Sequence, residues 1–226
     1  MNILPTIQMY IQNTKYLVFV SCHLNKMKKI LGIVVLGLLL SLNANADDIK
    51  DFQVEGISIG DSLLKYYSEA EIKKSIAWKQ GYKDDTFIRG SICNYGNTFC
   101  RANAELKTYD AIVFHFKKND PEYKLFMIAG IVNYTDKIED CLIEKKRTVQ
   151  ELKILFPKAK YKKKVVKLDK DKKNKAHTSY FFLDDGSASR VQCYDWSKSK
   201  KRLNIDSLKI SLDHPQYMDW NDNKAF

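Results

Sequence analysis

Alternating hydrophobic and polar positions recur in short segments along most of the chain after residue 85. Such alternation predicts β-strands, because successive side chains of a strand point to opposite faces of a sheet. We assign strands to residues 86–92, 109–118, 123–134, 162–168, 179–183, 189–194 and 205–213. A shorter strand is expected to begin at Gly56. Turn sequences such as "NDPE" (119–122) and "DDGSA" (184–188) separate neighbouring strands, which predicts hairpins.

Two segments instead have hydrophobic residues at the spacing of an amphipathic helix. In residues 136–156 the hydrophobic positions run from Ile138 to Phe156, and Pro157 ends the helix. Residues 62–78 are predicted to form two short helices that break near Ser68, which begins a capping box. Local hairpins with interspersed helices indicate the α+β class: one domain, a largely antiparallel sheet and two main helices.

The segment before this domain has a different character. Residues 27–48, "MKKILGIVVLGLLLSLNANADD", contain a basic start, a hydrophobic run of about 13 residues and a small-residue Ala-x-Ala pattern. This is the arrangement of a secretory signal peptide, and the run is short for a transmembrane helix, which needs roughly 20 residues. We expect cleavage after Ala46, an exported domain at 47–226, and an upstream start-site extension at 1–26.

Export changes the interpretation of the cysteines. Four of them, Cys93, Cys100, Cys141 and Cys193, lie in the expected exported domain. An even number in an oxidising compartment indicates disulfides. Three pairings are possible; the simplest joins Cys93 to Cys100 across a turn and Cys141 to Cys193 between a helix start and a strand.

The chain is basic, with a formal net charge of +11. An exported protein rarely meets nucleic acid, so we expect no nucleic-acid partner. Residues Lys158 to Lys175 include ten lysines and two aspartates. We interpret this run as a solvated strand edge and loop, in which lysine also discourages edge pairing. The alternative is a weak docking surface for anionic lipid or polymer.

The segment "ISIGDSLLKYYS" (57–68) contains Gly-Asp-Ser-Leu and resembles the nucleophile block of the GDSL (SGNH) esterases and lipases. The resemblance implies that Ser62 is a nucleophile. That family also has later Gly-x-Asn-Asp and Asp-x-x-His blocks. The nearest matches here are "KKND" (117–120), which lacks the glycine, and "SLDH" (211–214), which lacks the aspartate.

The family is also a parallel α/β sandwich, whereas this chain predicts hairpins. We therefore interpret the match as coincidental and expect no catalytic residue. In this interpretation Asp61 or Ser62 is a helix N-cap, because a short side-chain oxygen can accept the free N–H groups of a first helical turn.

Histidines and aromatic residues offer few further candidates. His115 alternates with Phe114 and Phe116 and is expected on the polar face of its strand. His177 is expected in the lysine-rich loop, and no histidine or cysteine spacing favours a metal or cofactor. The aromatic groups at 65–67, 180–182 and 194–196 are assigned to core packing, with a ligand groove as the alternative.

Three blocks, "VEGISIGDSLLKYYSEAEIKKS", "GIVNY…IEDCLIEKK…LKILFP" and "VQCYDW…DSLKISL", are similar to uncharacterised small exported proteins of marine alphaproteobacteria. The resemblance implies export and a shared fold, and it carries no activity. Together these observations predict a non-catalytic binding protein of the cell envelope, periplasmic or secreted, whose partner is a protein or another envelope component. The alternatives are a hydrolase centred on Ser62 and a peripheral protein held by Lys158–Lys175.

Overall fold

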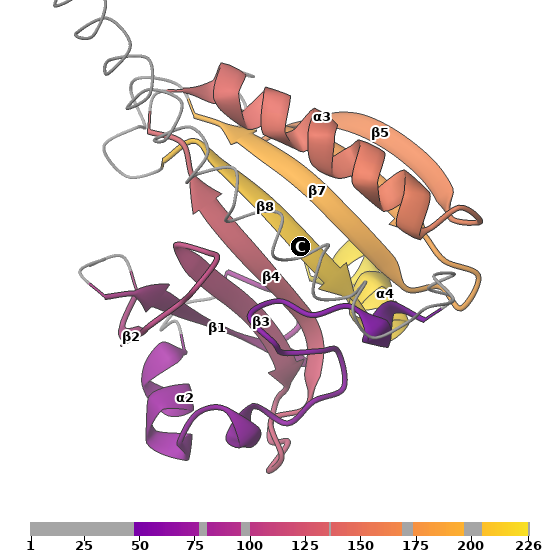
Figure 1. The fold of residues 1–226 in the computed structure, drawn as a ribbon. Coiled ribbons are helices and arrows are strands. Elements are labelled where there is room, and N and C mark those ends of the chain that lie inside the picture. The colour runs from indigo at the N-terminus through magenta and orange to yellow at the C-terminus, as the bar shows by residue number, and fades with distance from the viewer. Residues whose placement is uncertain are drawn as a thin grey trace, which may run out of the picture.

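The computed structural model describes residues 48–76, 81–95, 100–135, 137–168, 174–196 and 205–225 (Figure 1). Its helical elements are the 3₁₀-helices η1 (Ile49–Asp51) and η2 (Leu63–Lys65) and the α-helices α2 (Glu69–Ser75), α3 (Ile138–Leu155) and α4 (Pro215–Asn223). Its strands are β1 (Phe87–Asn94), β2 (Ala102–Ala104), β3 (Ala111–Lys117), β4 (Leu125–Asn133), β5 (Lys160–Lys167), β6 (Lys175–Phe182), β7 (Ala188–Asp195) and β8 (Ser207–Asp213).

All eight strands belong to one sheet in the order β2-β1-β3-β4-β8-β7-β6-β5. Each neighbouring pair is antiparallel except β1 and β2, which are parallel. The predicted α+β class and largely antiparallel sheet are therefore confirmed. The last strand, β8, pairs with both β4 and β7, and so joins the hairpins before α3 to those after it.

Three local predictions differ from the structure. The segment at Gly56 is not a strand: Val54 and Ile57 form an isolated bridge around Glu55 and Gly56, whose φ angles are both positive. The carboxylate of Glu55 accepts backbone N–H groups from residues 107, 108 and 109, which ties this turn to the start of β3. Strand β2 was not predicted, because three residues are too few to show a pattern. His177 lies in β6 and not in the preceding loop.

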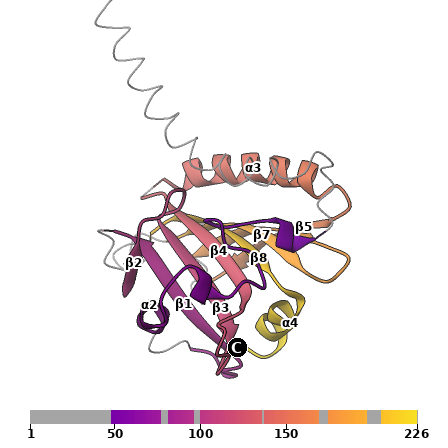
Figure 2. The same ribbon diagram turned by 60° about the horizontal axis from the view of Figure 1, so that its bottom comes forward.

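The two faces of the sheet are covered differently (Figure 2). Helix α3 lies along one face, where Val149 and Leu152 join a large core with Val191 and Leu208. Helix α4 lies on the opposite side, where its buried aromatic residues pack in a smaller cluster against Phe87 and small or apolar residues of β3 and β4. Because α4 has only nine residues, it covers one end of its face.

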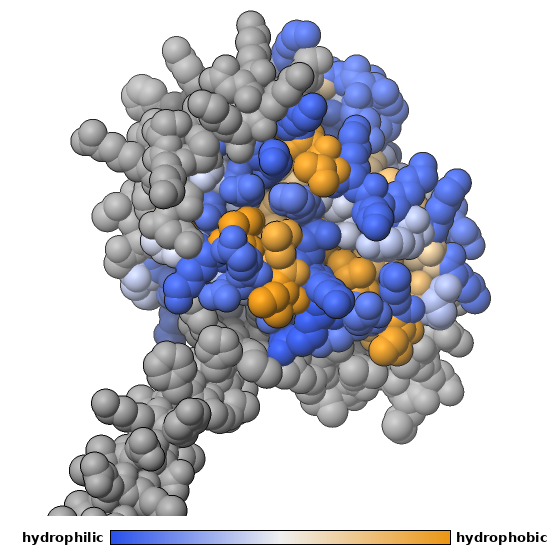
Figure 3. Space-filling model, turned by 90° about the horizontal axis from the view of Figure 1, so that it is seen from above, coloured by the Kyte–Doolittle hydropathy of each residue, from blue (hydrophilic) through white to orange (hydrophobic). Residues whose placement is uncertain are grey.

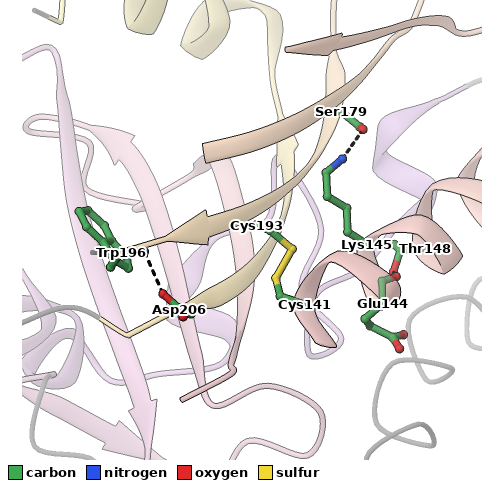
Figure 4. Close-up of a disulfide and its surroundings, with 8 residues drawn as sticks. All are labelled: Cys141, Glu144, Lys145, Thr148, Ser179, Cys193, Trp196 and Asp206. Atoms are coloured by element: carbon green, nitrogen blue, oxygen red, sulfur yellow. Dashed lines mark hydrogen bonds between the residues drawn. A yellow bond between two sulfur atoms is a disulfide. The ribbon is translucent and has the colours of Figure 1, made fainter. Parts of the chain in front are cut away.

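Both predicted disulfides are present. Cys141 at the start of α3 is joined to Cys193 of β7, with a Cα–Cα distance of 6.0 Å, and Cys93 is joined to Cys100. Figure 4 shows the first bridge beside a second link between the same layers, in which the Lys145 ammonium donates to the Ser179 hydroxyl at 2.7 Å. The bridge fixes α3 against the centre of the sheet.

The predicted signal peptide and start-site extension lie outside the described residues. Within the described part of the chain, no helix combines the length and apolar character needed to cross a membrane. Seen from above, hydrophobic side chains form small separate groups on a mainly hydrophilic surface (Figure 3). Ile143 and Ile154 of α3 are among the exposed apolar residues, and scattered residues of this kind are ordinary on folded proteins.

We predict that the two disulfides contribute unequally to stability. In the chain-entropy description a bridge stabilises by restricting the unfolded chain, and the effect grows with the loop it closes. The Cys141–Cys193 bridge spans 52 residues and the Cys93–Cys100 bridge spans 7. Replacing the first pair with alanine should lower the free energy of unfolding by about 4 kcal/mol, and replacing the second by about 2 kcal/mol. Urea unfolding measures both; an equal or reversed loss would contradict this ranking.

Candidate functional site

Ser62 has the geometry of a helix cap. Its Oγ accepts the backbone N–H of Leu64 at 3.2 Å and donates to the carbonyl of Glu122 at 2.5 Å. The backbone of Ser62 also forms a β-bridge with Lys124, so the hydroxyl caps η2 while the proton and the backbone bind the β3–β4 connection. No histidine is among the described hydrogen-bond partners of Ser62. The neighbouring Asp61 accepts from Lys65 and Tyr66, which orders the same turn.

The described part of the lysine run is an exposed sheet edge. Strand β5 is the outer strand beyond β6, and seven of its eight residues are exposed. Residues 169–173 of the run lie outside the described residues. This is the position in which lysine prevents edge-to-edge strand pairing.

A cavity of about 740 Å³ lies on the sheet face opposite α3. We refer to it as the sheet-face cavity. Its floor consists of side chains from β1, β3, β4, β8, β7 and β6, and Tyr82 and residues of α4 close one end. A volume of this size falls within the range of small-molecule sites.

The strand register explains why there is space. One row across the sheet contains Ser91, Val113, Ala129 and Ser211, before the much larger Arg190. Ser91 and Val113 of this row line the cavity, whereas Ala129 packs in the cluster beneath α4; aromatic residues stand at the margins. The sequence analysis assigned those aromatics to core packing. Tyr180 packs against Phe182 and Tyr194 against Trp196, as expected, but Tyr180, Tyr194 and Trp196 also line the cavity.

Arg190 and Asp213 form a buried ion pair at the cavity floor. The Arg190 guanidinium donates to both carboxylate oxygens of Asp213, at 2.7 and 2.5 Å, and Asp213 is fully buried. Burial alone would lower the pKa of Arg190, but the Asp213 carboxylate raises it above its usual value. The Ser211 hydroxyl also donates to Asp213 at 3.0 Å. The acceptors of Asp213 are therefore engaged, and the pair is close to neutral.

Lys209 lies two residues before Ser211 on the same face of β8, and it lines the cavity. Burial, together with the positive charges of Arg190 and Arg89, lowers its pKa to about 7, although the Asp213 carboxylate acts in the opposite direction. Among the described residues no carboxylate forms an ion pair with Lys209. An ammonium at this position is therefore only partly compensated.

Two further polar groups in the cavity have unmet hydrogen-bonding capacity. His115 is 2% exposed; its Nε2 lies 3.0 Å from the Tyr82 hydroxyl, whereas its Nδ1 has no partner among the described residues. Gln192 donates to Thr178, but its Oε1 also lacks a described partner. Burial, with Lys209, Arg89 and Arg190, holds the pKa of His115 well below its usual value, so the imidazole is neutral. His115 is not on a solvated polar face, as the sequence suggested, because α4 and Tyr82 cover it.

The cavity thus brings together three basic side chains, a neutral histidine, an amide and several aromatic rings. Arg89 lies directly across from His115, and Lys209 directly across from Gln192. Among the described residues that line it, none is an aspartate or a glutamate. Such a lining favours a ligand that accepts hydrogen bonds and carries negative charge.

A scan against protein-family models and searches of curated proteins and of solved structures found no match to this chain. The functional argument therefore depends on the geometry of the cavity.

We predict that Ser62 has a structural role. Ser62→Ala should lower the free energy of unfolding by about 1 kcal/mol, because it removes a cap and a link to the β3–β4 connection. The wild-type protein should remain unlabelled by a fluorophosphonate probe, because the Ser62 hydroxyl donates to a carbonyl and has no described base. Urea unfolding and intact-mass analysis test the two parts. Labelling that Ser62→Ala abolishes would restore the hydrolase interpretation.

Proposed function

We propose that this chain is a non-catalytic binding protein of the cell envelope, and that its ligand is a small molecule held in the sheet-face cavity. The observation that carries the proposal is one cavity whose lining combines Lys209, a half-buried cation without an ion pair among the described residues, with two buried polar atoms that have no described partner, His115 Nδ1 and Gln192 Oε1. A buried polar atom without a partner costs about 1–3 kcal/mol. Retaining two such atoms and an unpaired lysine around one space is understandable if a ligand completes the site.

Rigidity supports binding at this site. Lys209 and Gln192 project from β8 and β7, which are interior strands with a neighbour on each side. Arg190 is held by two hydrogen bonds to Asp213, and the Cys141–Cys193 bridge fixes β7 from the other face. A ligand would therefore meet side chains that are already in position, which reduces the entropic cost of binding.

The proposed compartment is the periplasm or the extracellular space, reached after cleavage near Ala46. Two disulfides in the described residues support it, because such bonds persist in oxidising environments. The hydrophobic run and Ala-x-Ala pattern before Asp47 support the same route.

The proposal predicts that filling the cavity blocks an uncharged apolar probe. Phenylnaphthylamine fluoresces in apolar surroundings and should bind the wild-type protein in a one-to-one ratio. Ser207→Trp should abolish the signal, because residue 207 lines the cavity on β8 and is partly exposed there. Gln150→Trp is the control: it places the same side chain on the exposed surface of α3, on the other face of the sheet.

Both variants should keep the wild-type circular dichroism spectrum and urea midpoint within error, because both positions have room for a larger side chain. Probe binding that persists in folded Ser207→Trp, or that is absent from the wild-type protein, would contradict binding in the cavity.

A further inference from the structure

We propose that the ligand of the sheet-face cavity is an amphipathic organic anion, with its acidic group against Lys209 and its apolar body extending away from α4. This inference rests on the proposed function and specifies the ligand class. It follows from three features of the cavity: the charge at one end, the apolar side chains at the other and the size of the space between.

Charge is concentrated near α4. In the row nearest α4, Arg89 lies across from His115; the next row contains Arg190, and the third contains Lys209. Each of the three cationic side chains lies close enough to lower the pKa of His115. Asp213 is the one carboxylate that acts on Lys209, and it is already bound to Arg190. An anionic group near Lys209 would relieve this repulsion and supply the acceptor that an ammonium requires.

The opposite end is apolar and aromatic. Tyr194 and Trp196 are nearly parallel, with ring centroids 6.2 Å apart. The apolar side chains that line the cavity beside them are Ala176, Val166, Leu168 and Ile205, and Ser207 and Asn133 are the polar members of the same row. Tyr194, Ala176 and Val166 form the next row of the sheet after the row that contains Lys209, on β7, β6 and β5. Leu168 lies just after β5, and Ile205 lies just before β8. An apolar body placed here would be buried, whereas a second charged group would be desolvated without a partner.

Size separates this ligand class from simple ions. A cavity of about 740 Å³ is far larger than one inorganic phosphate or sulfate. It suits a fatty or aromatic acid, or the corresponding phosphate monoester. The shared chemistry is a single acidic head group on an apolar body.

The proposal has a consequence for proton binding. The free Lys209 has a pKa of about 7, and a bound anion favours its charged form, so anion binding raises that pKa and takes up a proton. The affinity for the anion is therefore highest below pH 7. It falls as the pH rises from 7 towards the higher pKa that Lys209 has in the complex.

The other groups that face Lys209 keep their charge between pH 6 and 9. His115 is neutral because its pKa is lowered well below its usual value. Burial raises the pKa of each surrounding tyrosine above its usual value of 10; these are Tyr82, Tyr180, Tyr194 and Tyr217. The remaining charged groups are Arg89 and the ion pair between Arg190 and Asp213, and arginine side chains as a class are charged across this range. The pH dependence should therefore belong to Lys209.

The test compares phenylnaphthylamine with anilinonaphthalene sulfonate, which has the same apolar body and a permanent negative charge. At pH 6 the wild-type protein should bind the sulfonate at least about tenfold more tightly than the neutral probe, since a charged hydrogen bond is added. Lys209→Met should remove this preference, so that the ratio of the two probe affinities falls to about one. Calorimetry in buffers of different ionisation enthalpy should detect proton uptake near pH 7 in the wild-type protein and not in Lys209→Met.

Lys164→Met is the matched control, because residue 164 lies in the same row of the sheet as Lys209, three strands away on the exposed β5 edge. It should behave like the wild-type protein. An equal loss in Lys164→Met would assign the effect to surface charge and overturn the inference. Dodecanoate and dodecyl phosphate should displace the sulfonate probe, and dodecanol should not; their relative strengths distinguish a carboxylate from a phosphate ligand.

The outcomes separate the two proposals. If both probes bind with equal affinity and Ser207→Trp blocks both, the cavity is a binding site but the ligand class is wrong. If neither probe binds, or if Ser207→Trp changes nothing, the proposed function itself fails.

Discussion

The buried ion pair between Arg190 and Asp213 is the interaction on which the arrangement of the cavity depends. Two charged groups removed from water are tolerated only with close contact and satisfied hydrogen bonds, and here the contact is bidentate. It joins β7 to β8 on the face that α3 does not cover. It also engages the carboxylate nearest to Lys209, so the lysine remains without a counter-ion among the described residues. The Arg190–Asp213 ion pair therefore orders the floor of the sheet-face cavity and leaves Lys209 without a carboxylate partner among the described residues.

The difference between the two faces of the sheet follows from the covering helices. On one face, the 18 residues of α3 and the Cys141–Cys193 bridge produce a continuous apolar core. On the other, nine residues of α4 cover the end near His115, and the remaining strands carry short or polar side chains. The sheet thus supports a continuous core on one side and a cavity, the proposed binding site, on the other. Since side chains alternate along each strand, residues such as Gln192 and Cys193 serve different purposes one position apart.

Much of the fold could be predicted from local patterns, whereas the site could not. The capping box at Ser68, the helix before Pro157 and both cysteine pairings depend on residues close together or on a small number of alternatives. The cavity depends on which strands are neighbours. "RVQCYDW" shows alternating polar residues, but the same pattern describes a strand that faces water. Lys209 and Gln192 became recognisable as site residues only once β8 was placed in the middle of the sheet.

The central claim is that Lys209 is an uncompensated cation in a cavity that accepts an anion. The most direct measurement is an NMR titration of the Lys209 side chain in the disulfide-bonded protein, followed through its ε-carbon, without and with anilinonaphthalene sulfonate. The account predicts a midpoint near pH 7 in the free protein and a higher one in the complex. A midpoint at the ordinary lysine value near 10.5, unchanged by the anion, would contradict it.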